Sequence, residues 1–154
     1  VAKGAMLTHR NLIANMQQVH NCLQQTGEDG QPLMKEGGTM FAMSYYGANK
    51  VVANYNVMGP VKAALESTTR YMAHELGPKG IRVHTISPGP LKTRAASGIA
   101  HFDQLIDDAI ARAPQNRLVD IEDVGNTCAF LASDAARALT GEVTYVDGGF
   151  NIMA

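Results

Sequence analysis

The sequence predicts an α/β fold with a parallel sheet, because from Gly37 onward short apolar runs alternate with helical patterns. Three runs read as strands, at 39–44, 81–87 and 142–146. Alternation of this kind is typical of parallel strands joined by right-handed crossovers. The chain has 154 residues, 45% of them hydrophobic, so it suits one domain with a buried core.

The first strand and the first helix follow from local signals. Residues 39–44 are a short apolar run after paired glycines, which is consistent with a buried parallel strand. A helix is expected from about Asn54 to Leu76, because Gly77-Pro78 is a normal stop signal. Proline costs about 3 kcal/mol in a helix interior, so we expect Pro60 in or near the first turn.

The second half of the chain continues the alternation. The second strand, 81–87, is followed by a loop and an amphipathic helix within 95–113. Another helix is expected over 121–131, headed by Asp120. The last strand ends in Asp147-Gly148-Gly149, which we interpret as a structural turn rather than the position of a catalytic acid.

The N-terminal part differs in character. Residues 1–37 are polar and rich in glutamine, and Thr8 is placed to cap a short helix that runs to about Leu23. We therefore expect a helical extension over 1–37, not an independent domain, before the α/β part at 38–154.

Composition excludes several classes of function. A net charge of −1 gives no electrostatic reason to bind nucleic acid or an anionic membrane. No apolar run reaches the length of a membrane span, and the N-terminus lacks the layout of a signal peptide. Cys22 and Cys128 lie far apart and the five histidines are scattered, so we expect no metal site. The expected location is the reduced cytoplasm.

Two tyrosines and one lysine are the candidate reactive groups. Tyr55 and Lys62 are seven residues apart, and on a helix this is about 700°, nearly two full turns, so both side chains leave one face. A phenol and an ammonium held together can handle a proton. Tyr45 lies at the end of the first predicted strand and could join them. The alternatives are a lysine lying over an aromatic ring and a Tyr45 that only packs.

These residues carry a resemblance over 32–154. The segment resembles the C-terminal half of a bacterial enoyl-acyl-carrier-protein reductase, in the divergent branch of the short-chain dehydrogenase/reductases. The ordinary pattern of that superfamily places lysine four residues after tyrosine; here that position is Gly59, and the lysine comes at seven. The matching pieces are Ser44-Tyr45, Tyr55-Asn56-Val57-Met58-Gly59 with Lys62, Arg70-Tyr71, Gly80-Ile81-Arg82-Val83, Gly89-Pro90, Thr93, Ala95-Ala96-Ser97-Gly98-Ile99, Glu122-Asp123-Val124-Gly125 and Val146-Asp147-Gly148-Gly149.

The resemblance implies a fold and a reaction. The fold would be the C-terminal half of a Rossmann-like doubly wound sheet, and the reaction would be reduction of the trans-2 double bond of an enoyl thioester by NADH. Tyr55 would hydrogen-bond the thioester oxygen, Tyr45 would lie beside the acyl thioester, and Lys62 would hold the nicotinamide ribose. The other implied residues are Ser44, Pro90, Leu91, Thr93 and Ala95 at the cofactor, and Met58, Ala95, Ala96, Ile99 and Phe102 at the acyl chain, with Tyr45 and Tyr55.

The same resemblance implies an acyl-carrier-protein-bound substrate, a homotetramer and a mobile lid over the acyl pocket. Doubly wound folds bind the cofactor pyrophosphate at a Gly-rich turn after the first strand, and no such turn precedes residue 39. We therefore expect this chain to bind NADH poorly, to turn over little, and to leave an apolar, unpaired edge on its first strand.

The first residues resemble another family. Residues 1–12 are similar to the end of the phosphate-binding signature of AMP-forming fatty-acyl-CoA ligases and the helix after it. The likeness extends through the Gln-rich stretch to about residue 37, so the sequence is interpreted as a fusion of two fragments. Three functional classes follow: an enoyl reductase, a fragment of an acyl-CoA ligase, and a non-catalytic assembly fragment.

Overall fold

The computed structural model describes residues 37–91 and 102–153. The chain divides into two units after Gly38, and the described helices and strands belong to the second, Thr39–Ala154. The helix predicted from Thr8 and the loop residues Thr93, Ala95, Ala96 and Ile99 lie outside the described residues.

The sheet has three parallel strands, as predicted. Strands β1 (Thr39–Met43), β2 (Arg82–Pro88) and β3 (Val143–Val146) lie in the order β1-β2-β3. Thr39 is opposite Arg82, and Thr85 is opposite Val143. In the part of the chain that the structure describes, β1 pairs only with β2, and Phe41 and Met43 on it are 37% and 43% exposed. This is the apolar edge that the sequence predicts.

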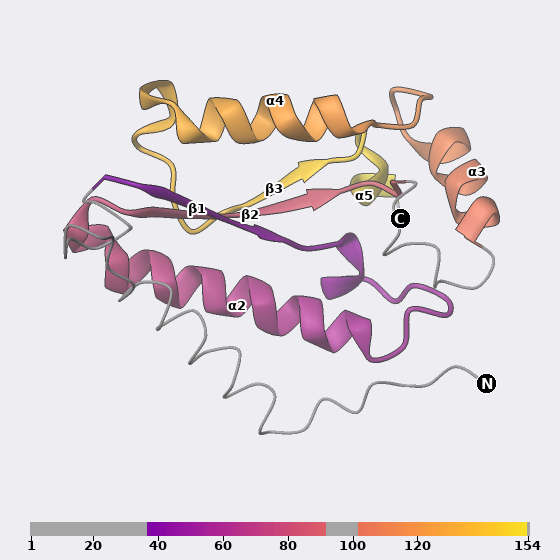
Figure 1. Cartoon of the computed structure of the whole chain (residues 1–154). Coiled ribbons are helices and arrows are strands. Elements are labelled where there is room, and N and C mark those ends of the chain that lie inside the picture. Colours follow the sequence, from indigo (N-terminus) through magenta and orange to yellow (C-terminus); the bar gives the residue numbers. More distant parts are fainter. Residues whose placement is uncertain (1–36, 92–101, 154) are drawn as a thin grey trace, which may run out of the picture. The chain divides into compact units, whose positions relative to one another are not determined.

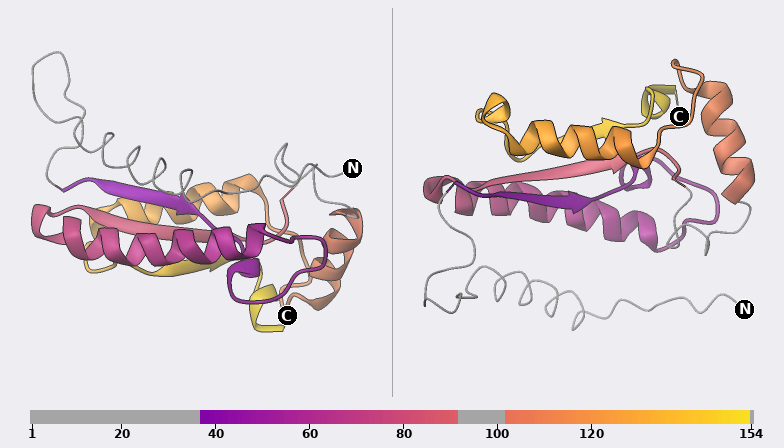
Figure 2. Two further views of the ribbon diagram at one scale, coloured as in Figure 1. Left: turned by 90° about the horizontal axis from the view of Figure 1, so that it is seen from below. Right: turned by 45° about the horizontal axis from the view of Figure 1, so that its top comes forward.

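Helices cover both faces of the sheet. Helix α2 (Met58–Leu76) packs against one face and α4 (Ile121–Ala132) against the other (Figures 1 and 2). Helices α3 (Phe102–Arg112) and α5 (Phe150–Met153) lie at the end of the sheet to which the strands point (Figure 1). Three short 3₁₀ helices complete the description: η1 (Tyr46–Ala48), η2 (Gly77–Lys79) and η4 (Asp134–Ala136).

The start of α2 corrects one prediction. The helix begins at Met58 rather than Asn54, so Tyr55 lies in the turn before it and does not share a helix face with Lys62. The reason is local, because Asn54 and Asn56 have φ values of 63° and 49°. Residues in this left-handed region cannot continue a right-handed helix. Pro60 is the third helical residue, in the first turn as expected, where its missing N–H costs nothing.

Helix α4 is held at both ends. At its start the Asp120 carboxylate accepts from the Asp123 N–H (2.9 Å) and the Asp123 carboxylate accepts from the Asp120 N–H (3.0 Å), which is a capping box. Arg117 pairs with Asp123 at 2.7 Å, and this hydrogen bond lowers the pKa of Asp123 to about 2. At its end, the guanidinium of Arg82 on β2 donates to four carbonyl oxygens, those of Leu131, Ala132, Ser133 and Ala136.

The buried side chains form distinct groups. Ile86 on β2 packs under α4 with Leu131 and Ala136. A second cluster lies at the carboxyl end of the strands and contains aromatic residues from the β1–α2 connection. Its members are Tyr45, Tyr46, Val52, Tyr55, Ala109, Ala113 and Phe150. The second cluster brings two of the predicted catalytic residues together.

Candidate functional site

The predicted catalytic residues lie at the carboxyl end of the sheet. Ligands of open α/β sheets bind outside the carboxyl ends of the strands. Tyr45 comes two residues after β1, and Pro90 and Leu91 follow β2. Pro90 is buried and Leu91 is half-buried, whereas Met58, at the start of α2, is 40% exposed. Helix α3 begins at Phe102 beside this end.

Tyr45 and Tyr55 are in direct ring contact. Their centroids lie 5.1 Å apart with the planes at 59°, and Tyr46 packs against Tyr45 edge-on at 4.7 Å. All three residues are less than a tenth exposed. The Tyr45 hydroxyl is buried and has no hydrogen-bond partner among the described residues. Burial raises the pKa of Tyr45, with smaller contributions from Tyr46 and Tyr55, and burial also raises the pKa of Tyr55, so both are phenols at neutral pH.

Lys62 binds the backbone of β1 two residues before Tyr45. Its ammonium donates to the carbonyl oxygen of Met43 at 2.7 Å. The Ser44 N–H donates to the Ile86 carbonyl of β2, and successive residues of a strand point opposite ways, so the Met43 carbonyl points to the open edge. Burial lowers the pKa of Lys62. An ammonium has three N–H donors, and among residues 37–91 and 102–153 only Met43 takes one of them.

A buried carboxylate that the sequence did not point to, that of Glu66, lies one helical turn after Lys62. Glu66 is 4% exposed. Its Oε1 accepts from the Ser44 hydroxyl at 2.6 Å, and its Oε2 accepts from the Asn49 side-chain amide at 3.2 Å. Asn49 also donates to the Tyr145 hydroxyl of β3 at 3.1 Å. The spacing of four from Lys62 is the signal that could have indicated Glu66, since such residues share a helix face.

Two glycines allow the β1–α2 connection to pack closely. A Cβ at Gly47 would lie 2.7 Å from Cδ1 and 2.9 Å from Cε1 of Tyr55. A Cβ at Gly59 would lie 3.0 Å from the Gly47 carbonyl oxygen. The start of α2 therefore lies directly against η1. Gly59 is the position where the ordinary dehydrogenase pattern has its lysine, and no larger side chain fits here without a shift.

Helices α3 and α5 cover the tyrosines. Ala109 belongs to the tyrosine cluster and Leu105 packs against it. Tyr46 meets the Phe150 ring edge-on at 5.2 Å, and the Arg112 guanidinium lies 5.5 Å from the centre of the same ring. Ile106, on the same helix as Arg112, is 5% exposed and also packs in the core.

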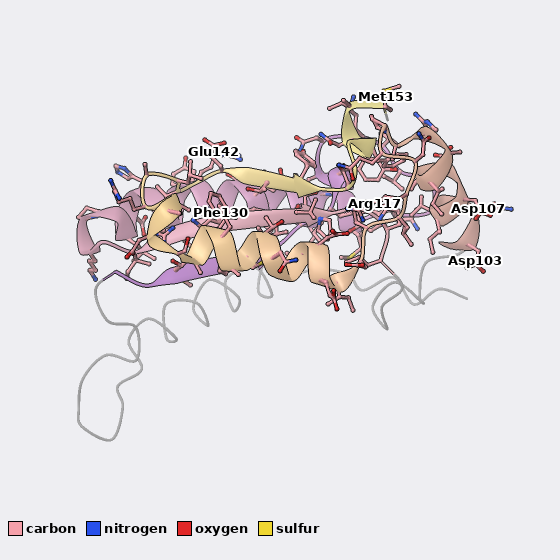
Figure 3. The ribbon with its side chains drawn as sticks, turned by 90° about the horizontal axis from the view of Figure 1, so that it is seen from above. Asp103, Asp107, Arg117, Phe130, Glu142 and Met153 are labelled. Atoms are coloured by element: carbon pink, nitrogen blue, oxygen red, sulfur yellow. The ribbon has the colours of Figure 1, made fainter. Side chains whose placement is uncertain are left out.

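A separate cavity of about 330 Å³ lies beside the end of β3. Its lining includes Arg117, Thr127, Tyr145, Asp147 and Asn151 and does not include Tyr45, Tyr55 or Lys62. Figure 3 shows Arg117 in the connection between α3 and α4.

The carboxylate of Asp147 is committed to the backbone, since it accepts from the N–H groups of Gly149 (2.9 Å) and Asn151 (2.8 Å). This is the structural turn that was expected. Over residues 37–91 and 102–153 no group of three or more metal-ligating side chains is present, and no helix is long and apolar enough to cross a membrane.

The comparisons with known proteins point to one family. A family model described as enoyl-(acyl carrier protein) reductase matches residues 8–151. The NADH enoyl-acyl-carrier-protein reductase of Escherichia coli strain K12 is 49% identical over 122 residues, which cover 79% of this chain and 47% of that protein. The corresponding enzyme of Rickettsia conorii is 40% identical over 154 residues, covering 96% of this chain and 59% of that protein.

Solved structures agree with this. The reductase of Aquifex aeolicus VF5 superposes with a TM-score of 0.78 at 44% identity, covering 94% of this chain and 52% of that one. The Bacillus cereus reductase, solved with NADP+ and indole naphthyridinone, gives 0.77 at 45% identity and covers 79% and 48%. The chain spans about half the length of the relatives it matches. The family match begins at residue 8, inside the segment that resembles a ligase, and gives that second resemblance no support.

Proposed function

Because the chain belongs to the enoyl-acyl-carrier-protein reductase family, we propose that it takes part in the NADH-dependent reduction of the trans-2 double bond of an enoyl thioester. The observation that carries this proposal is the group at the carboxyl end of β1. There the Tyr45 hydroxyl is buried without a partner among the described residues, the Tyr55 ring lies 5.1 Å away, and the Lys62 ammonium is two residues up the strand.

The residues present fit a nicotinamide cofactor. Within the described residues Lys62 uses one of its three N–H donors, which leaves two for ribose hydroxyls, and the Tyr45 hydroxyl, two residues after the Met43 carbonyl that Lys62 binds, has no partner there. We assign cofactor contacts to Lys62, Pro90 and Leu91, and to Thr93 and Ala95 in the segment outside the described residues. The bound nicotinamide would supply a hydride to the β-carbon of the substrate.

The protein's own part is to hold a proton at the thioester oxygen. Negative charge grows on that oxygen as the β-carbon is reduced, and a fixed phenol stabilises it by donating a hydrogen bond. Burial raises the pKa of Tyr55 and so keeps the donor protonated. The positive charge of Lys62 acts in the same direction. Tyr45 fills the space beside the donor, and Met58, Ala96, Ile99 and Phe102 are the proposed contacts of the acyl chain.

The substrate that we propose is an enoyl group carried on acyl carrier protein, since the relatives are named for it. A homotetramer and a cytoplasmic location are proposed on the same basis. The origin of residues 1–37 in an acyl-CoA ligase stays a hypothesis, and ATP-dependent formation of an acyl adenylate by the purified chain would support it.

Thioester-dependent NADH oxidation tests the proposed function. The purified chain is mixed with NADH and an enoyl thioester, and absorbance at 340 nm is followed. Tyr55→Phe should lower turnover by about 10²–10³-fold, the usual cost of losing a donor to a developing oxyanion. Tyr71→Phe is the matched control, because Tyr71 lies on α2 but is 69% exposed. Equal rates for wild type and Tyr55→Phe, or no thioester-dependent oxidation at all, would refute the proposal.

A further inference from the structure

Helix α2 presents three polar residues in a row to the sheet. Lys62, Glu66 and Thr69 are spaced by four and three residues, so they lie on one face. Lys62 donates to the Met43 carbonyl, Glu66 accepts from Ser44, and Thr69 accepts from the Thr85 hydroxyl at 2.8 Å. The face continues with Ala73 and Leu76, both buried and apolar. The first two of these polar residues, Lys62 and Glu66, therefore bind the chain where β1 ends, just before Tyr45.

Glu66 is the unusual member of this row. A carboxylate is stable in a buried position only when its oxygens are hydrogen-bonded. Both oxygens of Glu66 have such a bond, and the Ser44 hydroxyl is the nearer of the two donors, at 2.6 Å. No salt bridge to Glu66 occurs within the described parts of the chain. The two donors are thus what holds it there.

Those two donors flank the segment that carries Tyr45. Ser44 immediately precedes Tyr45, and Asn49 immediately follows the 3₁₀ helix η1. One side chain on α2 therefore fixes both ends of the segment 45–48. The segment's internal bonds are few, and include Ala48 N–H to Tyr45 O at 2.9 Å and Asn49 N–H to Tyr46 O at 3.0 Å. A short 3₁₀ turn of this kind has little stability of its own.

We propose that Glu66 is a positioning residue for the reductase site. It holds segment 45–48 against α2 and so sets the place of the Tyr45 ring, which lies 5.1 Å from the ring of Tyr55, the proposed donor. The inference rests on the proposed function but concerns a residue that makes no contact with substrate or cofactor. Because a displacement of about 1 Å at a reacting centre can cost about 10²-fold in rate, loss of this tie should appear in kcat.

Two replacements of Glu66 by side chains of similar length separate the effect of its hydrogen-bond acceptors from the effect of its volume. Glu66→Met keeps the volume and removes both acceptors. Glu66→Gln keeps an acceptor for Ser44, and the Asn49 amide can turn to accept from the new Nε2–H while the Tyr145 hydroxyl donates to it. Ser44→Ala removes only one hydroxyl, and serves if Glu66→Met does not fold. In a double variant, Ser44→Ala should add little to Glu66→Met, because both remove the same bond.

Turnover and hydrogen exchange are measured on the full chain. For Glu66→Met we expect kcat to fall about 10²-fold with the KM for NADH within about twofold, and amide exchange over residues 44–57 to speed up about tenfold. Glu66→Gln should restore both, and exchange in β2 (82–88) should be unchanged throughout. The proposal would be overturned if amide exchange over residues 44–57 in Glu66→Met were as slow as in the wild type. It would also be overturned if Glu66→Gln and Glu66→Met lowered kcat and sped up exchange equally. A wild-type chain without turnover would refute only the proposed function, since the exchange comparison still decides the role of Glu66.

Discussion

Replacing Gly47 by alanine should push Tyr55 out of place. The new Cβ would lie 2.7 Å from Cδ1 and 2.9 Å from Cε1 of the ring, and 3.4 Å from Cγ2 of Val52. Carbon atoms normally approach to about 3.5–4.0 Å, so the ring or the turn must move by about 1 Å. Overpacking of this size costs about 1–3 kcal/mol of unfolding free energy. In a chain of this length the melting temperature should drop by about 2–12 °C.

The same displacement should impair the reaction, because Tyr55 is the proposed hydrogen-bond donor. We expect thioester-dependent NADH oxidation to fall about 10²-fold. The midpoint of urea unfolding and the turnover number are both measured on the same preparation. Gly125→Ala is the control: it lies within α4, a Cβ there meets no described atom within 4 Å, and alanine favours a helix by up to about 1 kcal/mol. A Gly47→Ala variant as stable and as active as wild type would show that the turn absorbs a methyl group freely, contrary to this reasoning.

Three further substitutions test other contacts. Tyr45→Phe removes a buried hydroxyl that has no partner in the described structure, so stability should rise by about 1 kcal/mol. Burial raises the pKa of Tyr45 above its ordinary 10.0, so the folded chain keeps its full stability below pH 10 and loses stability as the pH rises through the folded-state pKa. Tyr45→Phe should therefore move alkaline unfolding, followed by circular dichroism, to higher pH. An unmoved transition would count against this expectation. Arg82→Met should lower the free energy of unfolding in urea by about 2–4 kcal/mol, because it leaves four carbonyls at the end of α4 without their donor. Arg82→Lys should recover only part of that stability, because one ammonium cannot reach all four carbonyls. Asp147→Ala should cost about 1–3 kcal/mol and expose the amides of Gly149 and Asn151 to exchange, and Asp147→Asn, with one acceptor oxygen, should cost about half; unchanged exchange would refute this account of the turn.

The strands and most helix ends were predictable because each depends on local patterns. The apolar run at 39–44 became β1 at Thr39–Met43, and the helix expected over 121–131 was found at Ile121–Ala132 with Asp120 as its cap. The start of α2 was not predictable from periodicity, because it depends on the left-handed backbone of Asn54 and Asn56. Asparagine adopts that region more often than most residues, but the sequence does not say where it will.

The site was predicted in part. Tyr45 and Tyr55 do meet, although a turn and a ring contact bring them together instead of a helix face that Tyr55 shares with Lys62. The catalytic roles of Tyr45, Tyr55 and Lys62 stay predictions. Glu66 was missed because a lone glutamate in a helix is ordinarily solvated, and its burial depends on donors that come from 17 and 22 residues earlier. The roles of Thr93, Ala95, Ala96 and Ile99 stay predictions.

The tie at Glu66 has a consequence for the order of folding. Ser44 and Glu66 are separated by 22 residues, whereas the bond from Asn49 to Tyr145 spans 96. The entropic cost of closing a loop grows with the logarithm of its length, so the shorter connection forms at lower cost, as soon as β1 and α2 meet. The reactive groups from Tyr45 to Lys62 thus lie within one short stretch of chain, and we expect that stretch to gain native order before β3 joins the sheet.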